Sequence, residues 1–344
     1  ASLAARANNV HDVARDGGSA RGGYPVFCLA DLQHLEGDQG GELHLDMKQP
    51  RIYFGPKIAS GAGDNQDYAI VGDDGSGNDR EYDTDTSSYT YTGSGGVDVS
   101  NIFNRAMYAT KFGSMNMLLS DVIGDDSKLL YDRDPRERVH KVAPWLTTDS
   151  KTYPVVVDGR IKWVVDGYTT LDDLPYAERT QLDSATEDAA NNDPAAQQRA
   201  VSNSVSYIRN SVKAVVDSYD GSVDLYEFDQ KDPVLKAWEG VFPGVVKPKS
   251  EISDELMSHL RYPEDMFKVQ RELIAKYHVD DPGVFFTNDA FWSVPSDPTA
   301  PEGRQELAQP PYHVVATDPE TNKSSFQLIT PFRGLRREFL AAQM

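Results

Sequence analysis

The stretch Val155-Val-Val-Asp-Gly-Arg-Ile-Lys-Trp-Val-Val165 decides the fold class, because it contains a complete β-hairpin pattern. Two runs rich in β-branched residues flank Asp158-Gly159. Gly takes a positive φ without steric cost and Asp tolerates one, so this dipeptide is typical of a tight primed turn. The same pattern recurs where 211–219 and 222–228 flank Asp220-Gly221. Both patterns predict antiparallel hairpins in the middle of the chain.

Helical signals surround these hairpins. Asp134-Pro135-Arg136-Glu137 combines an Asp N-cap, Pro at the first helical position and Glu three residues after the cap. Asp232-Pro233 opens a short helix in the same way. The stretch 100–119 predicts another helix, with one stripe formed by Ile102, Phe103, Ala106, Met107 and Thr110.

A longer helix is predicted to start at Pro263-Glu264-Asp265, where early acids suit the helix dipole. Its expected apolar face consists of Met266, Val269, Gln270, Leu273 and Tyr277. A last hairpin is expected at 312–317 and 324–330. Strands and helices are interspersed without regular βαβ alternation, so the sequence predicts an α+β fold of antiparallel hairpins packed with several helices.

Composition along the chain predicts four segments. Residues 1–23 are polar and Gly-rich and are expected to form an extended arm. Residues 24–177 form an N-terminal α+β half and residues 206–344 a C-terminal one, packed as one compact region. Between them, 178–205 is rich in Ala, Asp, Asn and Gln, which indicates a solvated acidic insertion or linker.

The charge balance limits the partners. The 344 residues include 34 basic and 54 acidic side chains, a formal net charge of −20. This charge repels phosphate backbones and anionic lipid, so nucleic-acid binding is disfavoured. Cys28 is the only cysteine, which excludes an internal disulfide and a cysteine metal cage. Its apolar neighbours favour a packing role.

No apolar run reaches the roughly 18 to 20 residues that would span a bilayer. The chain opens Ala-Ser-Leu-Ala, without an initiator Met or a signal-peptide pattern. We therefore expect the first residue to be a processing or fragment boundary.

Several strings match a known family in order and spacing. They are Gly23-Tyr-Pro-Val-Phe27, Gln49-Pro-Arg-Ile-Tyr-Phe-Gly55, Asp67-Tyr-Ala-Ile-Val-Gly72, Tyr89-Thr-Tyr-Thr-Gly-Ser-Gly-Gly-Val97, Arg133-Asp-Pro-Arg-Glu-Arg-Val-His-Lys-Val-Ala-Pro144, Tyr207-Ile-Arg-Asn-Ser-Val-Lys213 and His259-Leu-Arg-Tyr-Pro-Glu-Asp-Met-Phe-Lys268. Together they resemble the bacterial uncharacterised protein family 0182, from about residue 23 to the C-terminus.

The resemblance implies a setting rather than a reaction. Members look like multi-pass membrane proteins, in which several N-terminal spanning helices precede a large soluble region. This chain would be the main part of that region, on the extracytoplasmic face of the cell membrane. The family has no established catalytic or ligand residues to carry over.

One acidic loop is a candidate cation site. Residues 73–79 read Asp-Asp-Gly-Ser-Gly-Asn-Asp and are followed by Glu81. Calcium takes six to eight oxygen ligands, which such a loop can supply. The candidate ligands are Asp73, Asp74, Asp79 and Glu81. The spacing does not fit an EF-hand, and a plain solvated loop is the favoured interpretation; no other cofactor is expected.

Three further groups of polar residues could have either a structural or a functional role. Glu42, His44 and Asp46 would share one face of a strand, where they suit a metal or proton transfer, although a half-buried strand shows the same alternation. Asp158 and Asp166 could act as a carboxylate pair for glycan hydrolysis, although the turn already explains Asp158. The basic cluster could grip an anionic polymer, but internal ion pairing is favoured. It comprises Arg133, Arg136, Arg138, His140 and Lys141.

The absence of nucleophile-elbow, zincin, P-loop and complete dinucleotide motifs favours a non-enzymatic module. The leading hypothesis is an interaction or scaffold region of unknown biochemical function, working with its own spanning helices and a membrane or envelope protein partner. One alternative is a cell-envelope enzyme that hydrolyses glycan, lipid or peptide with carboxylates in a cleft. Another is a calcium-stabilised binding module.

Overall fold

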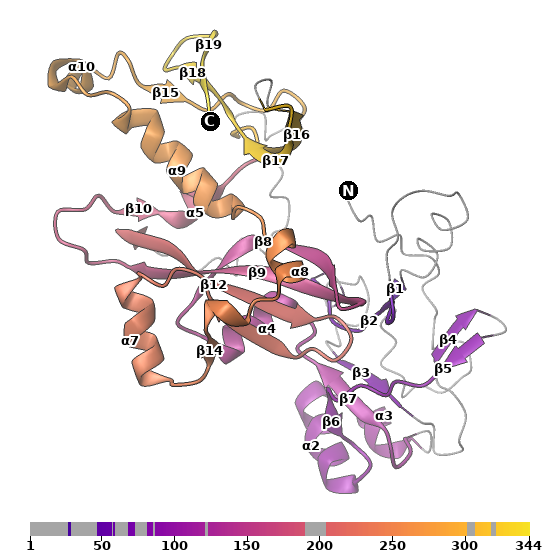
Figure 1. Cartoon of the computed structure of the whole chain (residues 1–344). Helices are drawn as coiled ribbons and strands as arrows, with labels where there is room; N and C mark the ends of the chain where they lie inside the picture. The colour runs from indigo at the N-terminus through magenta and orange to yellow at the C-terminus, as the bar shows by residue number, and fades with distance from the viewer. Residues whose placement is uncertain are drawn as a thin grey trace.

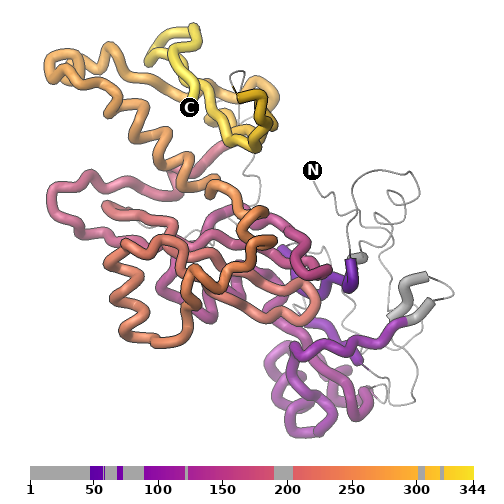
Figure 2. The backbone as a smooth tube through the Cα atoms, viewed as in Figure 1, coloured from indigo at the N-terminus to yellow at the C-terminus, as the bar shows by residue number. Residues whose placement is uncertain are grey.

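The computed structural model describes residues 27–28, 47–56, 58, 68–72, 81–84, 87–120, 123–189, 204–300, 307–317 and 321–344. Figure 1 shows three tiers: a small sheet with two helices at one end, a larger sheet in the middle, and a long helix with small sheets at the other end. The backbone trace in Figure 2 runs from the purple lower tier to the orange and yellow upper tier. The predicted α+β class is confirmed.

The middle tier is a five-stranded sheet with the order β14-β13-β12-β9-β8. Its pairs are antiparallel except β13 with β14. The sheet takes strands from both sides of the predicted linker, because β9 pairs with β12. Its strands are β8 (Thr147–Val157), β9 (Arg160–Leu171), β12 (Tyr207–Asp217), β13 (Val223–Glu227) and β14 (Val246–Lys247).

The two Asp-Gly turns differ. Asp158 and Gly159 have φ of 57° and 73° and join β8 to β9 as a tight primed turn, as predicted. The second prediction of a tight turn is wrong, because β12 already ends at Asp217 and only Gly221 has a positive φ. The Asp217 carboxylate accepts hydrogen bonds from two following amides, and its carbonyl accepts one from the Gly221 amide. These bonds wind the chain through a longer turn.

Helices cover both faces of the central sheet. On one face, α4 (Pro135–Val142) and α7 (Pro233–Val241) bury Val139 and Leu235 against Val165, Val212, Ala214 and Val216. On the other face, α8 (Asp254–His259) contributes Leu256. Asp134 and Asp232 each accept two amide hydrogen bonds at the predicted helix starts, followed by Pro. Both N-cap predictions are confirmed.

The lower tier is the three-stranded sheet β3-β7-β6, made of β3 (Tyr68–Val71), β7 (Lys128–Tyr131) and β6 (Val97–Asp98). The helices α2 (Ile102–Phe112) and α3 (Met115–Leu119) pack on one face of it through Ala109 and Met117. The predicted single helix over 100–119 is therefore two helices. Gly113, in the left-handed conformation with φ of 64°, ends the first helix.

The upper tier is built on α9 (Glu264–Tyr277). Met266 and Val269 are buried as predicted, but Leu273 and Tyr277 are exposed and Lys268 and Arg271 are buried in their place. Part of the expected solvated insertion packs here too, because α5 (Leu182–Thr186) buries Leu182 and Ala185 beside Val269. The division of the chain at 178–205 stays a prediction.

The remaining elements are short. The predicted last hairpin is confirmed as β16 (Tyr312–Thr317) with β17 (Ser324–Ile329). Next to it, β15 (Trp292–Ser293), β18 (Pro331–Gly334) and β19 (Leu340–Gln343) form a three-stranded sheet. The others are β1 (Phe27–Cys28), β2 (Arg51–Ile52), β4 (Glu81–Thr84), β5 (Ser87–Tyr89), β10 (Thr180–Gln181), β11 (Ser204–Val205), the 3-10 turn Lys249–Glu251 and α10 (Pro282–Thr287). Within the described ranges, no helix combines the length and apolar character needed to cross a membrane.

Candidate functional site

The outer side of α2 and α3 exposes large apolar side chains, and we call this surface the α2–α3 tip. Phe103 and Met107 are four residues apart on α2, and Met115 and Leu119 are four apart on α3, so each pair lies on one helical face. The tip comprises Ile102 (65% exposed), Phe103 (69%), Met107 (54%), Met115 (63%) and Leu119 (72%). The stripe predicted over 100–119 thus faces outward, while Tyr108, Ala109 and Phe112 pack inward.

The two cations of the tip segment fold back toward its base. Arg105 donates from Nε to the Val99 carbonyl at 2.8 Å and from Nη2 to the Ile123 carbonyl at 2.7 Å. The Lys111 ammonium lies 4.1 Å from the centre of the Tyr131 ring, a cation–π contact. Both charges are therefore used to hold the helices on the small sheet.

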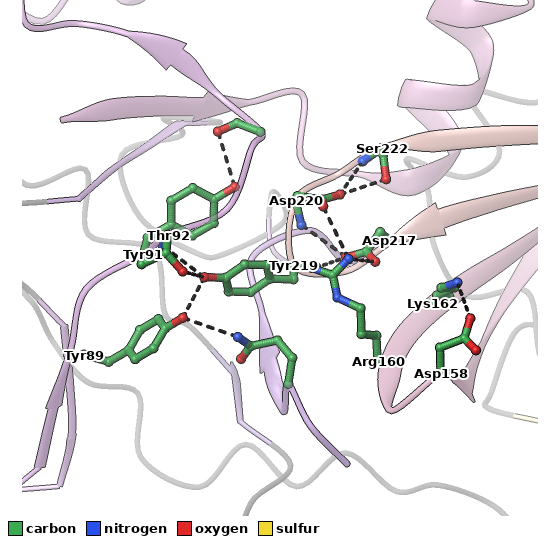
Figure 3. A network of polar contacts seen from close by, with 12 residues as sticks. Tyr89, Tyr91, Thr92, Asp158, Arg160, Lys162, Asp217, Tyr219, Asp220 and Ser222 are labelled. Carbon is green, nitrogen blue, oxygen red and sulfur yellow. Dashed lines mark hydrogen bonds and ion pairs between the residues drawn. The ribbon is translucent and has the colours of Figure 1, made fainter. Parts of the chain in front are cut away.

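A second feature joins the lower tier to the central sheet, and Figure 3 shows it from close by. The glycine-rich loop 89–97 closes on the turn 217–222, and we call this junction the clasp. Tyr219 is its centre, because its hydroxyl lies 2.7 Å from the Tyr89 hydroxyl and accepts the Thr92 amide at 3.0 Å. The contact explains the string of tyrosines and glycines that resembles the family pattern.

Glycines allow the close approach at the clasp. A Cβ on Gly95 would lie 1.9 Å from the Asp220 carbonyl oxygen. A Cβ on Gly221 would lie 2.6 Å from the Phe54 ring, and Gly221 has φ of 73°. Both positions therefore need glycine for steric reasons.

The acids of the clasp are occupied by structural partners. Asp217 binds the Arg160 guanidinium at 2.9 Å, and Asp220 accepts hydrogen bonds from the amide and hydroxyl of Ser222. Burial, and next the charge of Asp220, raises the pKa of Asp217. The arrangement braces a turn and leaves neither carboxylate turned toward a substrate cleft.

A pocket of about 310 Å³ lies beside the clasp. Its walls are mostly apolar, with Asp132, Arg138 and Lys141 as the charged residues. Arg138 donates to the Gly221 carbonyl at 2.7 Å, and Lys141 pairs with Asp132 at 2.5 Å. Burial lowers the pKa of Arg138. A single, ion-paired acid does not supply the two carboxyl groups that glycan hydrolysis uses.

Buried polar contacts hold α9 to the central sheet. Asp149 accepts hydrogen bonds from the Tyr168 hydroxyl at 2.5 Å and the Asp265 amide at 2.9 Å. Asp265 in turn accepts from the amide and hydroxyl of Ser150. Burial, followed by the charges of Asp265 and Asp166, raises the pKa of Asp149 well above its usual range.

Two buried ion pairs extend this network. Lys268 is fully buried and binds Asp188 at 2.5 Å and Glu264 at 3.1 Å. Lys213 pairs with Asp166, and both are buried in the sheet. Such pairs are costly to break from one side, because the remaining charge stays buried.

The candidates from the sequence have different outcomes. Asp73, Asp74, Asp79 and the whole of 42–46 lie outside the described residues, and Glu81 begins β4 without a described side chain. The calcium site therefore stays a prediction. Within the described ranges, no group of three or more His, Cys, Asp or Glu side chains is arranged to hold a metal ion.

The proposed carboxylate pair is not formed. Asp158 sits in its turn, 3.7 Å from the Lys162 ammonium, whereas Asp166 is buried against Lys213. The internal ion pairing favoured for the basic cluster is found for Lys141, whereas the three arginines make internal hydrogen bonds to backbone carbonyls. Its contacts include Arg133 to the Tyr53 carbonyl, Arg136 to the Ser150 carbonyl, Arg138 to the Gly221 carbonyl and Lys141 to Asp132.

The fold and these contacts define the class of protein: an α+β module of antiparallel hairpins, braced by buried polar networks and apolar at its exposed ends. Residues 3–344 match the model of the Uncharacterised protein family (UPF0182), and the chain belongs to that family. No solved structure matches the chain.

Curated relatives support the same family. The chain is 73% identical over 343 residues to the UPF0182 protein jk1603 of Corynebacterium jeikeium (strain K411), which covers 99% of this chain and 34% of that protein. It is 65% identical to the UPF0182 protein DIP0733 of Corynebacterium diphtheriae, with coverage of 99% and 34%. It is 55% identical to the UPF0182 protein of Nocardia farcinica (strain IFM 10152), again with 99% and 34%. The chain thus spans about a third of the length of these relatives.

Proposed function

We propose that this chain is a non-catalytic scaffold module on the extracytoplasmic face of a bacterial membrane. In this proposal, hydrophobic helices of a longer protein hold the module at the membrane, and it binds an envelope protein partner there. The observation that carries the proposal is the presence of exposed apolar side chains on α2 and α3 and on β16–β17. Figure 1 shows these elements in the lower and upper tiers of the molecule. Large exposed apolar patches on soluble domains mark interaction sites.

The second apolar surface lies on the hairpin β16–β17. Val315 and Phe326 are directly opposite each other in the register, and they are 70% and 52% exposed. A two-stranded hairpin is marginally stable in water unless another surface covers it. An envelope protein that covers this apolar pair would stabilise the hairpin, which makes β16–β17 the partner-binding end in the proposal.

The buried acids support a binding role over hydrolysis. A general acid or base must come within hydrogen-bond reach of a substrate atom. Asp149, Asp166 and Asp217 instead contact the protein's own tyrosine, lysine, arginine and amide groups. Burial raises the pKa of all three carboxylates and these contacts oppose the rise, so folding accounts for the altered pKa values.

Site-specific photo-cross-linking in cells tests the proposal. In the intact protein, Phe326 is replaced by a photoreactive phenylalanine analogue, and the matched control places the same analogue at the fully exposed Tyr176. We expect a discrete adduct with another protein from position 326 and none from position 176. Adducts of the protein with itself alone, or equal adducts from both positions, would contradict a scaffold role.

A further inference from the structure

We propose that the α2–α3 tip inserts its apolar side chains into the interfacial region of a lipid bilayer. This inference rests on the scaffold function proposed above and assigns the membrane-facing end of the module. The ligand class is a lipid surface of low net charge. Contact with it would orient the module, with β16–β17 directed away from the bilayer.

The shape of the tip suits insertion. Its five side chains come from two adjacent helices and are each more than half exposed. Phe and Leu are among the residue types that amphipathic membrane-surface helices bury at the headgroup and acyl-chain boundary, and Ile and Met are apolar as well. In Figure 1 these helices lie at the lower extremity of the molecule, so a flat surface can approach them.

The charge around the tip points to lipid. The chain has 54 acidic residues, yet none lies between Val99 and Ser120. The two cations in this stretch, Arg105 and Lys111, bind carbonyls and an aromatic ring at its base. The tip therefore lacks the acidic side chains that favour contact with water over contact with lipid.

The α2–α3 tip is also preformed in the absence of a membrane. Ala109 and Met117 are buried against the small sheet, and Asn101 caps α2 by accepting the Asn104 amide at 2.8 Å. A preformed helix pair loses little conformational entropy on binding, unlike a segment that must fold at the surface.

The lack of hydrogen-bonding groups on the tip favours lipid over a protein partner. Protein interfaces are enriched in aromatic residues, Met and Arg, and they make about one hydrogen bond per 100–200 Å². The five tip side chains carry no hydrogen-bonding group other than the weak thioether sulfurs of Met107 and Met115. Apolar side chains can be buried in the hydrocarbon of a bilayer without forming hydrogen bonds, so the composition of the tip suits that environment.

Vesicle flotation of the 344-residue chain tests the inference. The probe is vesicles of zwitterionic phosphatidylcholine, and the variant is the double substitution F103S/M107S. The matched control is F339S/L340S, which removes two exposed apolar side chains (56% and 68% exposed) from the upper tier. Binding scales with the apolar area that is buried. We therefore expect the tip variant to bind vesicles at least about tenfold more weakly than the original chain, and the control to bind like the original chain.

Circular dichroism tests whether both variants are folded. If the first tip variant unfolds, M115S/L119S is the second tip variant. Failure of the original chain to float, or equal loss in the tip and control variants, overturns the inference. The cross-linking result at Phe326 is independent of this test. A protein adduct there together with absent vesicle binding would retain the scaffold function and reject the lipid contact.

Discussion

Gly221 is the residue on which the clasp most directly depends. Its φ of 73° lies in the left-handed region, and the position of its missing Cβ is 2.6 to 2.8 Å from three atoms of the Phe54 ring. Phe54 is itself buried, and its carbonyl accepts the Trp163 indole at 2.7 Å. The buried ring also lies 4.6 Å from the Arg138 guanidinium, so it has little room to move aside for a methyl group.

We expect Gly221→Ala to lower the free energy of unfolding by about 2–4 kcal/mol, since backbone strain and overpacking both act. The control is Gly244→Ala, where φ is 81° and nothing lies within 4 Å of the added Cβ. Strain alone predicts a loss of about 1–2 kcal/mol there. Urea unfolding measures both, and equal losses would show that the Phe54 contact is not restrictive.

Asp149 predicts a dependence of stability on pH. Burial raises its pKa in the folded state, so the native protein binds this proton more tightly than the unfolded chain does. The resulting stabilisation is complete below the ordinary value of 3.8 and is lost as pH rises through the raised pKa.

Asp149→Asn removes this titration. We expect the unfolding free energy of the original chain, minus that of the variant, to fall as pH increases from 4.5 to 7.5. Urea unfolding at three pH values across this range measures the difference. An increase with pH would mean that the hydrogen bonds from Tyr168 and Asp265 favour the charged carboxylate more than burial disfavours it.

At the residue scale, local signals could be predicted and distant partners could not. Asp134 and Asp232 were identifiable as N-caps because a cap contacts amides two or three residues away. The partner of Lys213 is 47 residues distant, and that of Tyr219 is 130 residues distant. Such pairs depend on sheet register and loop docking, for which a single sequence gives no local signal.

Among the helices, α9 depends most on a buried charge. Lys268 lies in its second turn and is fully buried, with Asp188, Glu264 and Asp265 around its ammonium group. Burial lowers its pKa, but the acids together raise it, and the net direction is upward. The helix therefore docks through a compensated cation as well as through apolar contact.

We expect Lys268→Met to destabilise the protein by about 3–5 kcal/mol, because the buried Asp188 and the nearby Glu264 would lose the ammonium group that compensates their charge. On the same helix, Lys276 pairs with Glu178 at 3.5 Å, and both side chains are about half exposed. Lys276→Met should cost about 0–1 kcal/mol. Thermal or urea unfolding separates the two variants, and a loss at Lys268 as small as that at Lys276 would exclude a structural role for the buried pair.

The same cation explains why the face of α9 was predicted only in part. Met266 and Val269 follow the apolar pattern, whereas Lys268 and Arg271 read as surface residues in any periodicity argument. The reverse holds for α2, where Ile102, Phe103 and Met107 of the predicted stripe are exposed to solvent. In both helices the predicted element exists, but its orientation is set by partners outside the helix. For α2, the acid-free stretch 99–120 was the available signal.

For the whole molecule, the excess of acid has a measurable consequence. A net charge of −20 in one compact chain opposes folding through self-repulsion. Salt screens this repulsion, because the Debye length falls from about 30 Å at 0.01 M to about 8 Å at 0.15 M. The exposed ion pairs oppose this trend only weakly.

We therefore expect the Tm at pH 8 to rise when sodium chloride is increased over that range. Near the isoelectric point of about 4.7 the effect should shrink, because little net charge remains to be screened. Differential scanning calorimetry at the two pH values provides the comparison. A Tm that falls with salt at pH 8 would show that specific ion pairs outweigh the net repulsion.

The class of the whole molecule was predictable because hairpins and capped helices are local features. Its assembly was not, because the predicted halves 24–177 and 206–344 share the pair β9–β12 in one sheet. The small sheet with α2 and α3 is held against this sheet by long-range contacts such as the clasp. Hydrophobic patterning identifies strands but does not say which distant strand lies beside them.

The clasp also constrains how the protein can be made. During translation, Thr92 is synthesised 127 positions before its partner Tyr219. During that interval Phe54 and Tyr91 have no turn to cover their rings, so we expect the emerging chain to need chaperone protection. Chains truncated before Gly221 would be unable to close this junction, and we expect them to be degraded by proteolysis.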